Sequence, residues 1–246
     1  MASPRILPGL VLTFVAASVL CPRLGRAASK HNQDKVPAVR WDETRPGCTF
    51  SRGDDGKYRY GLSSGDLAVT MAVDSQELGK VHRRHQQFFA VLLTVRYRGP
   101  QSLELSTNNI SLEFLKHFRV IQTSLDPDDF AARIQRDADA LNDEIAHEVQ
   151  KHPEQKEQKE ADMRAYLKDS AELTEFLGKN SLRPTTLNPG NPETSGWVLF
   201  STQSKWISGW KKQEEFLLRV PLDGKIFEFP FLLPPKPGEA ILRKRD

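Results

Sequence analysis

Short apolar runs dominate the first half of the chain. They span residues 67–73, 88–97, 102–106, 110–114 and 117–123, and turn residues such as Gly, Pro and Asn lie between several of them. Runs of this length and composition are typical of β-strands. The run at 88–97 is almost continuously apolar, which predicts burial on both faces. Because no helical pattern separates these runs, we expect an antiparallel sandwich or barrel.

A helical period replaces this pattern between residues 126 and 179. Asp126 followed by Pro127 is typical of a helix start, since aspartate caps the free N–H groups and proline fits the first turn. Pro153 then interrupts the pattern. Apolar residues recur at helical spacing on both sides of this break, at Phe130, Ile134, Leu141, Ile145 and Val149 and again at Met163, Tyr166, Leu167, Phe176 and Leu177. The pattern predicts two helices that form an antiparallel hairpin.

Strand character returns after the helices, at residues 196–202, 216–220 and 226–231. Asp223-Gly224 lies between the last two runs and is a strong signal for a tight β-hairpin turn. We therefore predict one sandwich formed by residues 48–125 and 180–235, with the helical hairpin of residues 126–179 inserted into it.

The first 27 residues have the layout of a secretory signal peptide. Arg5 precedes an apolar run at residues 6–20, and small residues stand at Gly25 and Ala27. The run is shorter than the roughly 20 apolar residues that a membrane span needs. We expect cleavage near Ala27, no transmembrane helix in the mature chain, and a secreted or periplasmic protein.

Polar sequence flanks the predicted sandwich on both sides. We expect a flexible leader at residues 28–47, with Trp41 docked at its end, and a basic tail at residues 236–246. Because Cys21 leaves with the signal peptide, Cys48 has no partner for an internal disulfide. It is expected either to be a small buried residue or to pair between chains.

The charge of the chain is unevenly distributed. The full sequence has 35 basic and 32 acidic residues, and removal of Arg5, Arg23 and Arg26 with the signal peptide leaves 32 of each. Bulk positive charge therefore gives no support to a nucleic-acid partner. Residues 126–179 contain 15 acidic and 8 basic residues, so the rest of the mature chain carries the matching positive excess. Three interpretations stay open: solvated helices, docking of the acidic hairpin on a basic sandwich face, or a basic face that binds an acidic polymer or lipid surface.

No motif for catalysis or for a bound cofactor stands out. The chain lacks a phosphate-binding loop, and Ser64-Gly65 and Ser208-Gly209 have the character of turns, so we assign no catalytic residue and expect no cofactor. His82 and His85 are three residues apart, but two arginines lie between them and no third ligand is evident, so no metal site is predicted. Asp126, Asp128 and Asp129 fit a helix start better than a calcium loop.

A tryptophan-bearing basic segment is the candidate partner surface. Residues 205–212 read Lys-Trp-Ile-Ser-Gly-Trp-Lys-Lys, and we select Trp206, Trp210, Lys211 and Lys212. Tryptophan beside lysine can stack on sugars or lie at a membrane interface. The alternative is that Trp206 and Trp210 cover a sandwich edge, while Trp197 and Phe200 belong to the core.

The segments at residues 187–190, 195–200 and 216–220 resemble the closing half of bacterial secreted immunoglobulin-like β-sandwich proteins, with a Pro-Gly turn and a Gly-x-x-x-Phe strand. The resemblance implies a mainly β fold, an antiparallel immunoglobulin-like sandwich, and a binding or accessory role without a catalytic site. The helical hairpin and the missing disulfide depart from that family. We expect an exported, non-enzymatic domain that binds a protein or another envelope component. The alternative is an envelope hydrolase with an unrecognised site.

Overall fold

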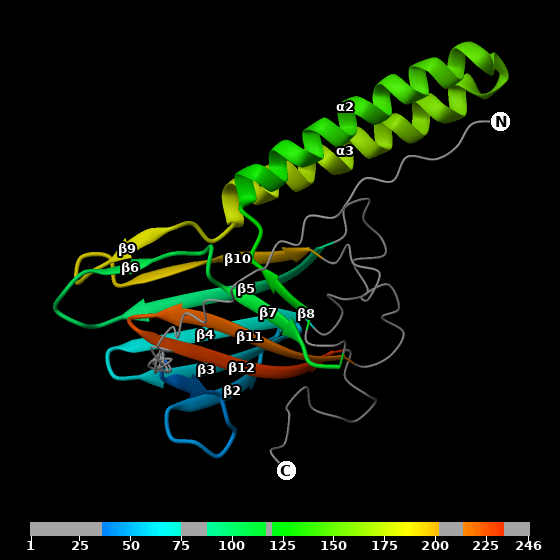
Figure 1. Ribbon diagram of the computed structural model, residues 1–246. Helices are drawn as coiled ribbons and strands as arrows, with labels where there is room; N and C mark the ends of the chain where they lie inside the picture. Colours follow the sequence, from blue (N-terminus) through cyan, green and yellow to red (C-terminus); the bar gives the residue numbers. More distant parts are fainter. Residues whose placement is uncertain (1–35, 75–87, 117–119, 202–213, 234–246) are drawn as a thin grey trace, which may run out of the picture. The chain divides into compact units, whose positions relative to one another are not determined.

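A computed structural model describes residues 36–74, 88–116, 120–201 and 214–233 (Figure 1). The fold is mostly β, with two long helices between the eighth and ninth strands. The elements in chain order are β1 (Ala38–Arg40), β2 (Cys48–Arg52), β3 (Lys57–Ser64), β4 (Leu67–Asp74), β5 (Phe88–Tyr97), β6 (Leu103–Leu105), β7 (Ser111–Phe114), β8 (Val120–Thr123), α2 (Pro127–Lys151), the 3₁₀ turn η1 (Pro153–Gln155), α3 (Lys156–Asn180), β9 (Thr185–Leu187), β10 (Glu193–Ser201), β11 (Glu214–Leu222) and β12 (Lys225–Leu233).

The strands form two five-stranded sheets. Sheet A has the order β1-β12-β11-β7-β8, and sheet B has the order β10-β5-β4-β3-β2. Every neighbouring pair is antiparallel except β1 and β12, which run parallel. A short third sheet joins β6 to β9. The predicted mainly antiparallel β fold with a helical part is therefore confirmed.

The two large sheets share one hydrophobic core. Alternate residues of each strand point into it, as the two-residue period of a β-strand requires. Aromatic rings join the sheets at one end: the ring centroid of Phe89 on β5 lies 5.5 Å from that of Phe216 on β11 and 6.3 Å from that of Phe231 on β12. All three side chains are fully buried. These contacts hold sheet A against sheet B.

Strand β5 only partly meets the prediction of burial on both faces. Its inward residues, from Phe89 to Val95, lie in the shared core. Phe88 and Ala90 face the other way and are buried beneath the helices. Leu92 and Thr94 on that outer face are only half-buried, because the helices cover just the first part of the strand.

Both ends of the helical hairpin are hydrogen-bonded to the outer edge of β10. The backbone N–H of Leu125, just before α2, donates to the carbonyl of Leu199 at 2.7 Å, and that of Leu182, just after α3, donates to the carbonyl of Trp197 at 2.9 Å. Phe130, Leu177 and Leu199 then pack together in a second apolar cluster. The base of the hairpin therefore closes an edge strand that would otherwise expose unpaired backbone groups.

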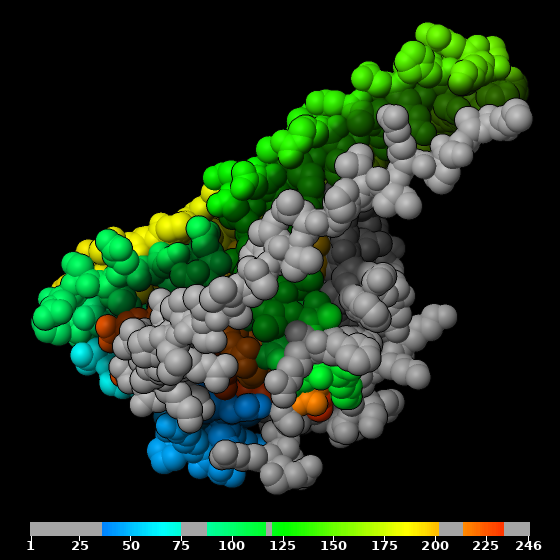
Figure 2. All heavy atoms as spheres, in the orientation of Figure 1, coloured from blue at the N-terminus to red at the C-terminus, as the bar shows by residue number. Residues whose placement is uncertain are grey.

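The outer half of the hairpin has a small core of its own. Ala138, Met163 and Tyr166 are buried between the two helices, with Leu141 and Ile145 partly buried beside them. No strand residue belongs to this cluster. In Figure 2 the side chains of α2 and α3 lie against each other along the hairpin.

Capping residues set the helix ends where the sequence indicates. Asp126 Oδ1 accepts hydrogen bonds from the backbone N–H groups of Asp128 and Asp129, at 2.9 and 3.1 Å. Helix α2 ends at Lys151, and its C-cap His152 directly precedes Pro153. The predicted turn at Asp223-Gly224 is also confirmed, since both residues have positive φ (49° and 66°) as the favoured two-residue hairpin turn requires. Neither helix contains an apolar stretch long enough to cross a membrane.

The prediction of a flexible leader over residues 28–47 is wrong for residues 38–40, whereas the predicted docking of Trp41 is confirmed. Ala38–Arg40 form β1, and the adjacent Trp41 is 2% exposed. Its indole N–H donates to the Thr49 carbonyl at 3.1 Å. The partner of β1 lies near the C-terminus, at Ile226 to Glu228, so no local pattern reveals the pairing. Cys48 is free and half-buried against the core, and its Sγ lies 3.5 Å from the backbone N of Asp42.

A substitution at Gly196 on β10 tests how closely the base of the hairpin approaches this strand. A Cβ at this position would lie 2.4 Å from the backbone N of Leu182, whereas a Cβ on Gly178 in α3 would meet nothing within 4 Å. We expect Gly196→Ala to lower the free energy of unfolding by about 1–3 kcal/mol, as overpacking does. Gly178→Ala is expected to raise it by up to about 1 kcal/mol, because alanine favours a helix more than glycine. Urea denaturation measures both, and equal stabilities would contradict the packing described.

Candidate partner-binding surfaces

The four residues selected from the sequence, Trp206, Trp210, Lys211 and Lys212, lie outside the described residues. The segment that contains them connects Ser201, the last residue of β10, to Glu214, the first residue of β11. His82 and His85 also lie outside. The structure therefore places the ends of the segment and leaves its side chains as a prediction.

Several segments outside the described residues begin or end at strand ends that lie together at one end of the sandwich. Ser201 pairs with Phe88, and Glu214 pairs with Leu233. Lys116, at the end of β7, donates its backbone N–H to Glu214 Oε1 at 3.2 Å. The stacked rings of Phe89 and Phe216 bring the two sheets together at this same end. We call it the Ser201 end.

The positive charge predicted for the β-rich part is not carried by the strands that the structure describes. Outside the hairpin, the described residues include 11 Lys or Arg and 13 Asp or Glu. Residues 75–87, 117–119, 202–213 and 234–246, which all border the Ser201 end, contain 11 basic and 3 acidic residues. The net positive charge of the β-rich part therefore lies mainly in these bordering segments, and a basic sandwich face stays a prediction.

Several basic residues of the acidic hairpin are paired with its own carboxylates. Lys159 of α3 lies 2.6 Å from Glu148 of α2, and several pairs four residues apart run along α3, such as Arg164 with Glu160. The hydrogen bond from Lys159 lowers the pKa of Glu148. These contacts favour ordinary solvated helices over docking of the hairpin's length on the sandwich.

An ion pair also links the first turn of α2 to the segment just after α3, at the base of the hairpin. Arg183 donates to both carboxylate oxygens of Asp128, at 2.5 and 2.9 Å. These hydrogen bonds lower the pKa of Asp128 and raise that of Arg183. The pair lies beside the backbone contacts of Leu125 and Leu182, so it contributes to the same junction.

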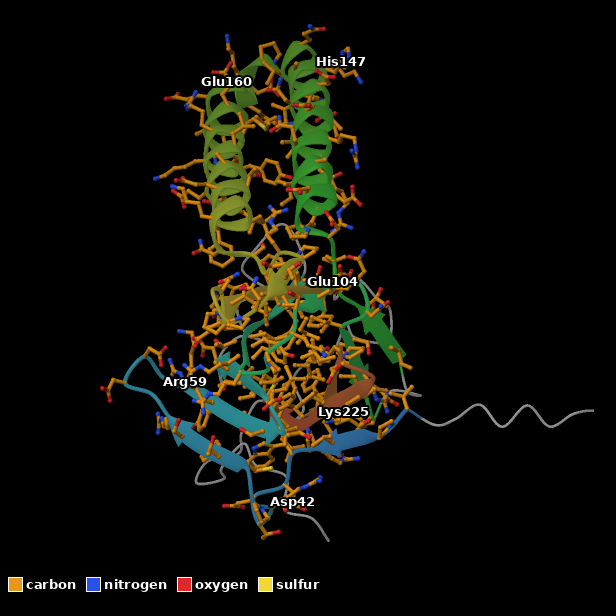
Figure 3. The ribbon with its side chains drawn as sticks, turned by 90° about the vertical axis from the view of Figure 1, so that its left-hand side faces the viewer. Asp42, Arg59, Glu104, His147, Glu160 and Lys225 are labelled. Atoms are coloured by element: carbon orange, nitrogen blue, oxygen red, sulfur yellow. The ribbon has the colours of Figure 1, made fainter. Side chains whose placement is uncertain are left out.

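A groove lies between the two helices in their outer half, the part of the hairpin that carries His147 and Glu160 in Figure 3. It has a volume of about 380 Å³, with Ile145, Val149, Met163 and Leu167 as its apolar lining and Glu160 at its rim. Leu167 is 41% exposed. Asn142, Lys156 and Arg164 also line the groove, so its lining is mixed, and no neighbouring element of the described structure indicates what would fill it.

Trp197 does not lie in the core, where one interpretation of the sequence places it together with Phe200. Phe200, three residues later, is fully buried in the shared core. Trp197 instead lies half-buried on the outer face of sheet B, where its ring centroid is 6.0 Å from that of Phe176 on α3. Lys57 Nζ approaches the same ring at 6.0 Å. The indole therefore lies on the outer face of sheet B, beside the second apolar cluster, and does not belong to the shared core.

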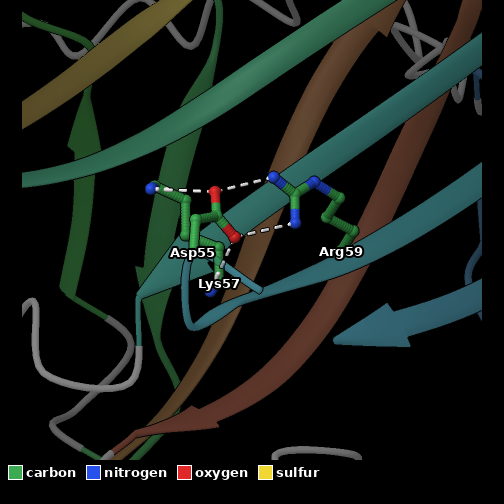
Figure 4. A network of polar contacts seen from close by, with 3 residues as sticks. All are labelled: Asp55, Lys57 and Arg59. Atoms are coloured by element: carbon green, nitrogen blue, oxygen red, sulfur yellow. Dashed lines mark hydrogen bonds and ion pairs between the residues drawn. The ribbon is translucent and has the colours of Figure 1, made fainter. Parts of the chain in front are cut away.

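A polar network fixes the turn between β2 and β3 (Figure 4). Arg59 Nη1 and Nη2 donate to the two carboxylate oxygens of Asp55 at 3.0 and 2.7 Å, and Lys57 Nζ donates to the same carboxylate at 3.1 Å. Arg59 first, and Lys57 second, hold the pKa of Asp55 far below its ordinary value. The basic groups of Lys57 and Arg59 are therefore already paired with Asp55.

Metal-ligand chemistry finds no support among the described residues, where no three His, Cys, Asp or Glu side chains are close enough to hold an ion. His152 contacts Glu154 through Nδ1, at 3.3 Å, at the hairpin tip. No family model matches the chain, and neither curated proteins nor solved structures gave a match.

The network at Asp55 predicts an unusual titration. By NMR, the Asp55 carboxyl should titrate well below the ordinary pKa of aspartate, and Arg59→Gln should move that pKa back toward it. Because the folded pKa is lowered, the carboxylate stabilises the fold above the unfolded-state pKa, and this contribution disappears as the pH falls through the folded one. An unchanged pKa in Arg59→Gln would contradict the pairing.

Proposed function

We propose that this chain is an exported, non-enzymatic binding or accessory domain with an immunoglobulin-like sandwich as its scaffold. Its partner is an acidic polymer of the cell envelope or extracellular space. The residues that contact it are Trp206, Trp210, Lys211 and Lys212, in the segment joined to the Ser201 end. Export rests on the signal-like first 27 residues.

The observation that supports this proposal is that the strand ends next to the basic segments lie together at the Ser201 end. The pairs Ser201–Phe88 and Glu214–Leu233 lie at one end of two sheets that share a rigid core. Segments rich in lysine and arginine begin and end there, in contrast to the slightly acidic strands. Binding residues commonly occupy connecting segments held by a rigid scaffold. Clustered cations attract an anionic polymer and raise its association rate.

The self-paired hairpin supports the same assignment. Its ion pairs, such as Lys159 with Glu148, use charges of the hairpin itself. In this proposal the hairpin is an accessory element rather than the polymer-binding surface.

Retention on immobilised heparin, a polyanion probe, tests the proposal with the mature chain. Lys211→Ala with Lys212→Ala should weaken binding about tenfold at low salt, since two exposed charge contacts of up to about 1 kcal/mol each are lost. Trp206→Ala with Trp210→Ala should also weaken it, and all binding should fall as salt rises.

The matched control removes the same charge from the hairpin, through Lys156→Ala with Lys168→Ala. Both of these lysines are exposed. The control should keep the retention of the unchanged chain. The proposal fails if the two double-lysine variants elute alike, or if the tryptophan variant unfolds and so proves to have lost core residues.

A further inference from the structure

An exposed turn carries the only Asn-x-Ser or Asn-x-Thr sequence of the chain with a residue other than proline in the middle, Asn109-Ile110-Ser111. An oligosaccharyltransferase recognises the asparagine and the hydroxyl residue of this motif when it attaches an N-linked glycan to an exported chain. A glycan is bulky and hydrophilic, so the asparagine that carries it has to lie on the surface of the folded protein. The surroundings of Asn109 in the fold therefore decide whether this sequence can serve as an acceptor.

Asn109 lies at the tip of the turn between β6 and β7. The backbone N–H of Ile110 donates to the Thr107 carbonyl at 3.1 Å, which closes a β-turn with Asn108 and Asn109 as its central residues. Both asparagines are exposed, whereas Thr107 is 6% exposed and Ile110 is fully buried. The two ends of the turn are therefore anchored in the protein, and the asparagines between them are open to solvent.

Contacts from Ser124, just after β8, hold both ends of this turn. The backbone N–H of Ser124 donates to the Ile110 carbonyl at 2.9 Å, and its Oγ donates to the Thr107 carbonyl at 2.6 Å. The hydrogen bonds that fix the turn thus use its backbone carbonyl and N–H groups. A substituent on the Asn109 side chain leaves all of them intact.

Ser111 supplies the hydroxyl of the motif and then becomes part of β7, where it is half-buried and pairs with Arg219 of β11. That partner lies roughly 100 residues farther along the chain, so it is synthesised about 5–20 s later at the usual rate of about 5–20 residues per second. During this interval β7 cannot yet pair with β11. The transferase therefore has access to Asn109 and Ser111 before sheet A forms.

Strand β7 separates the acceptor from the Ser201 end. Its first residue, Ser111, follows the turn, whereas its last residue, Phe114, pairs with Phe216 at the Ser201 end. A glycan on Asn109 is therefore attached at the opposite end of this strand from the segment proposed to bind the polymer.

We propose that Asn109 is the acceptor of an N-linked glycan, which is added as the exported chain enters a eukaryotic secretory pathway. The donor is an oligosaccharide linked to a lipid diphosphate. A bond forms between Nδ2 of Asn109 and C1 of the first sugar, and the bond between C1 and the diphosphate oxygen breaks. Nδ2 loses one proton, and the lipid diphosphate leaves. This inference rests on the export that the proposed function includes, and it does not depend on the residues proposed to bind the polymer.

Expression of the full chain in insect cells, with its own first 27 residues as the leader, tests the proposal. The protein should migrate more slowly in gel electrophoresis, and peptide N-glycosidase F should remove this shift and leave aspartate at residue 109, which mass spectrometry detects. Asn109→Gln and Ser111→Ala should each lose the shift, whereas Ser111→Thr, which keeps the hydroxyl, should retain it. Asn108→Gln, in the same turn, is the matched control and should be glycosylated like the unchanged chain.

A second set of the same variants has the signal peptide of a known secreted protein in place of residues 1–27, so that entry into the pathway does not depend on the leader of this chain. The proposal is overturned if protein of this set, in the medium or in the cell extract, shows no shift that the glycosidase removes. It is also overturned if the shift persists in Asn109→Gln. If the second set shows the shift and only the set with the chain's own leader lacks it and stays in the cell, the acceptor is supported and the proposed export fails.

Discussion

The hydrogen bonds between the hairpin base and β10 are the constraint on which the rest of the arrangement depends. Leu125 and Leu182 donate to consecutive outward carbonyls of β10, those of Leu199 and Trp197. They close the edge of sheet B and fix both ends of a helical insertion at one place. Gly196 is required there because the Leu182 backbone leaves no room for a side chain. With its base fixed in this way, the hairpin needs only a small core around Met163 and Tyr166 farther out.

The charged residues are distributed differently in the hairpin, on the face of sheet B and in the segments at the Ser201 end. Several basic residues of the hairpin pair with its own carboxylates, such as Lys159 with Glu148. The sheet B face pairs its own charged residues, Arg96 with Glu193 and Arg59 with Asp55. The excess of positive charge is encoded in segments that border the Ser201 end.

Local patterns predict the elements whose cause is local. The run at 88–97 coincides with β5, Asp126 caps α2, and Asp223-Gly224 makes the tight turn. Features that depend on distant partners are not predictable in this way. Strand β1 exists because it pairs with Ile226 to Glu228, and Trp197 faces outward because of its register against Leu92.

Native-state hydrogen exchange measured by NMR tests the junction most directly. Amides that open only with global unfolding exchange most slowly. The Leu125 and Leu182 amides should exchange as slowly as the slowest amides of β5 and β10, while amides near the hairpin tip, around His147 and Glu160, exchange faster. If Leu125 and Leu182 instead exchange at the rate of the tip, the hairpin is not fixed to the edge of the sandwich, and the junction cannot be the constraint that holds the two parts together.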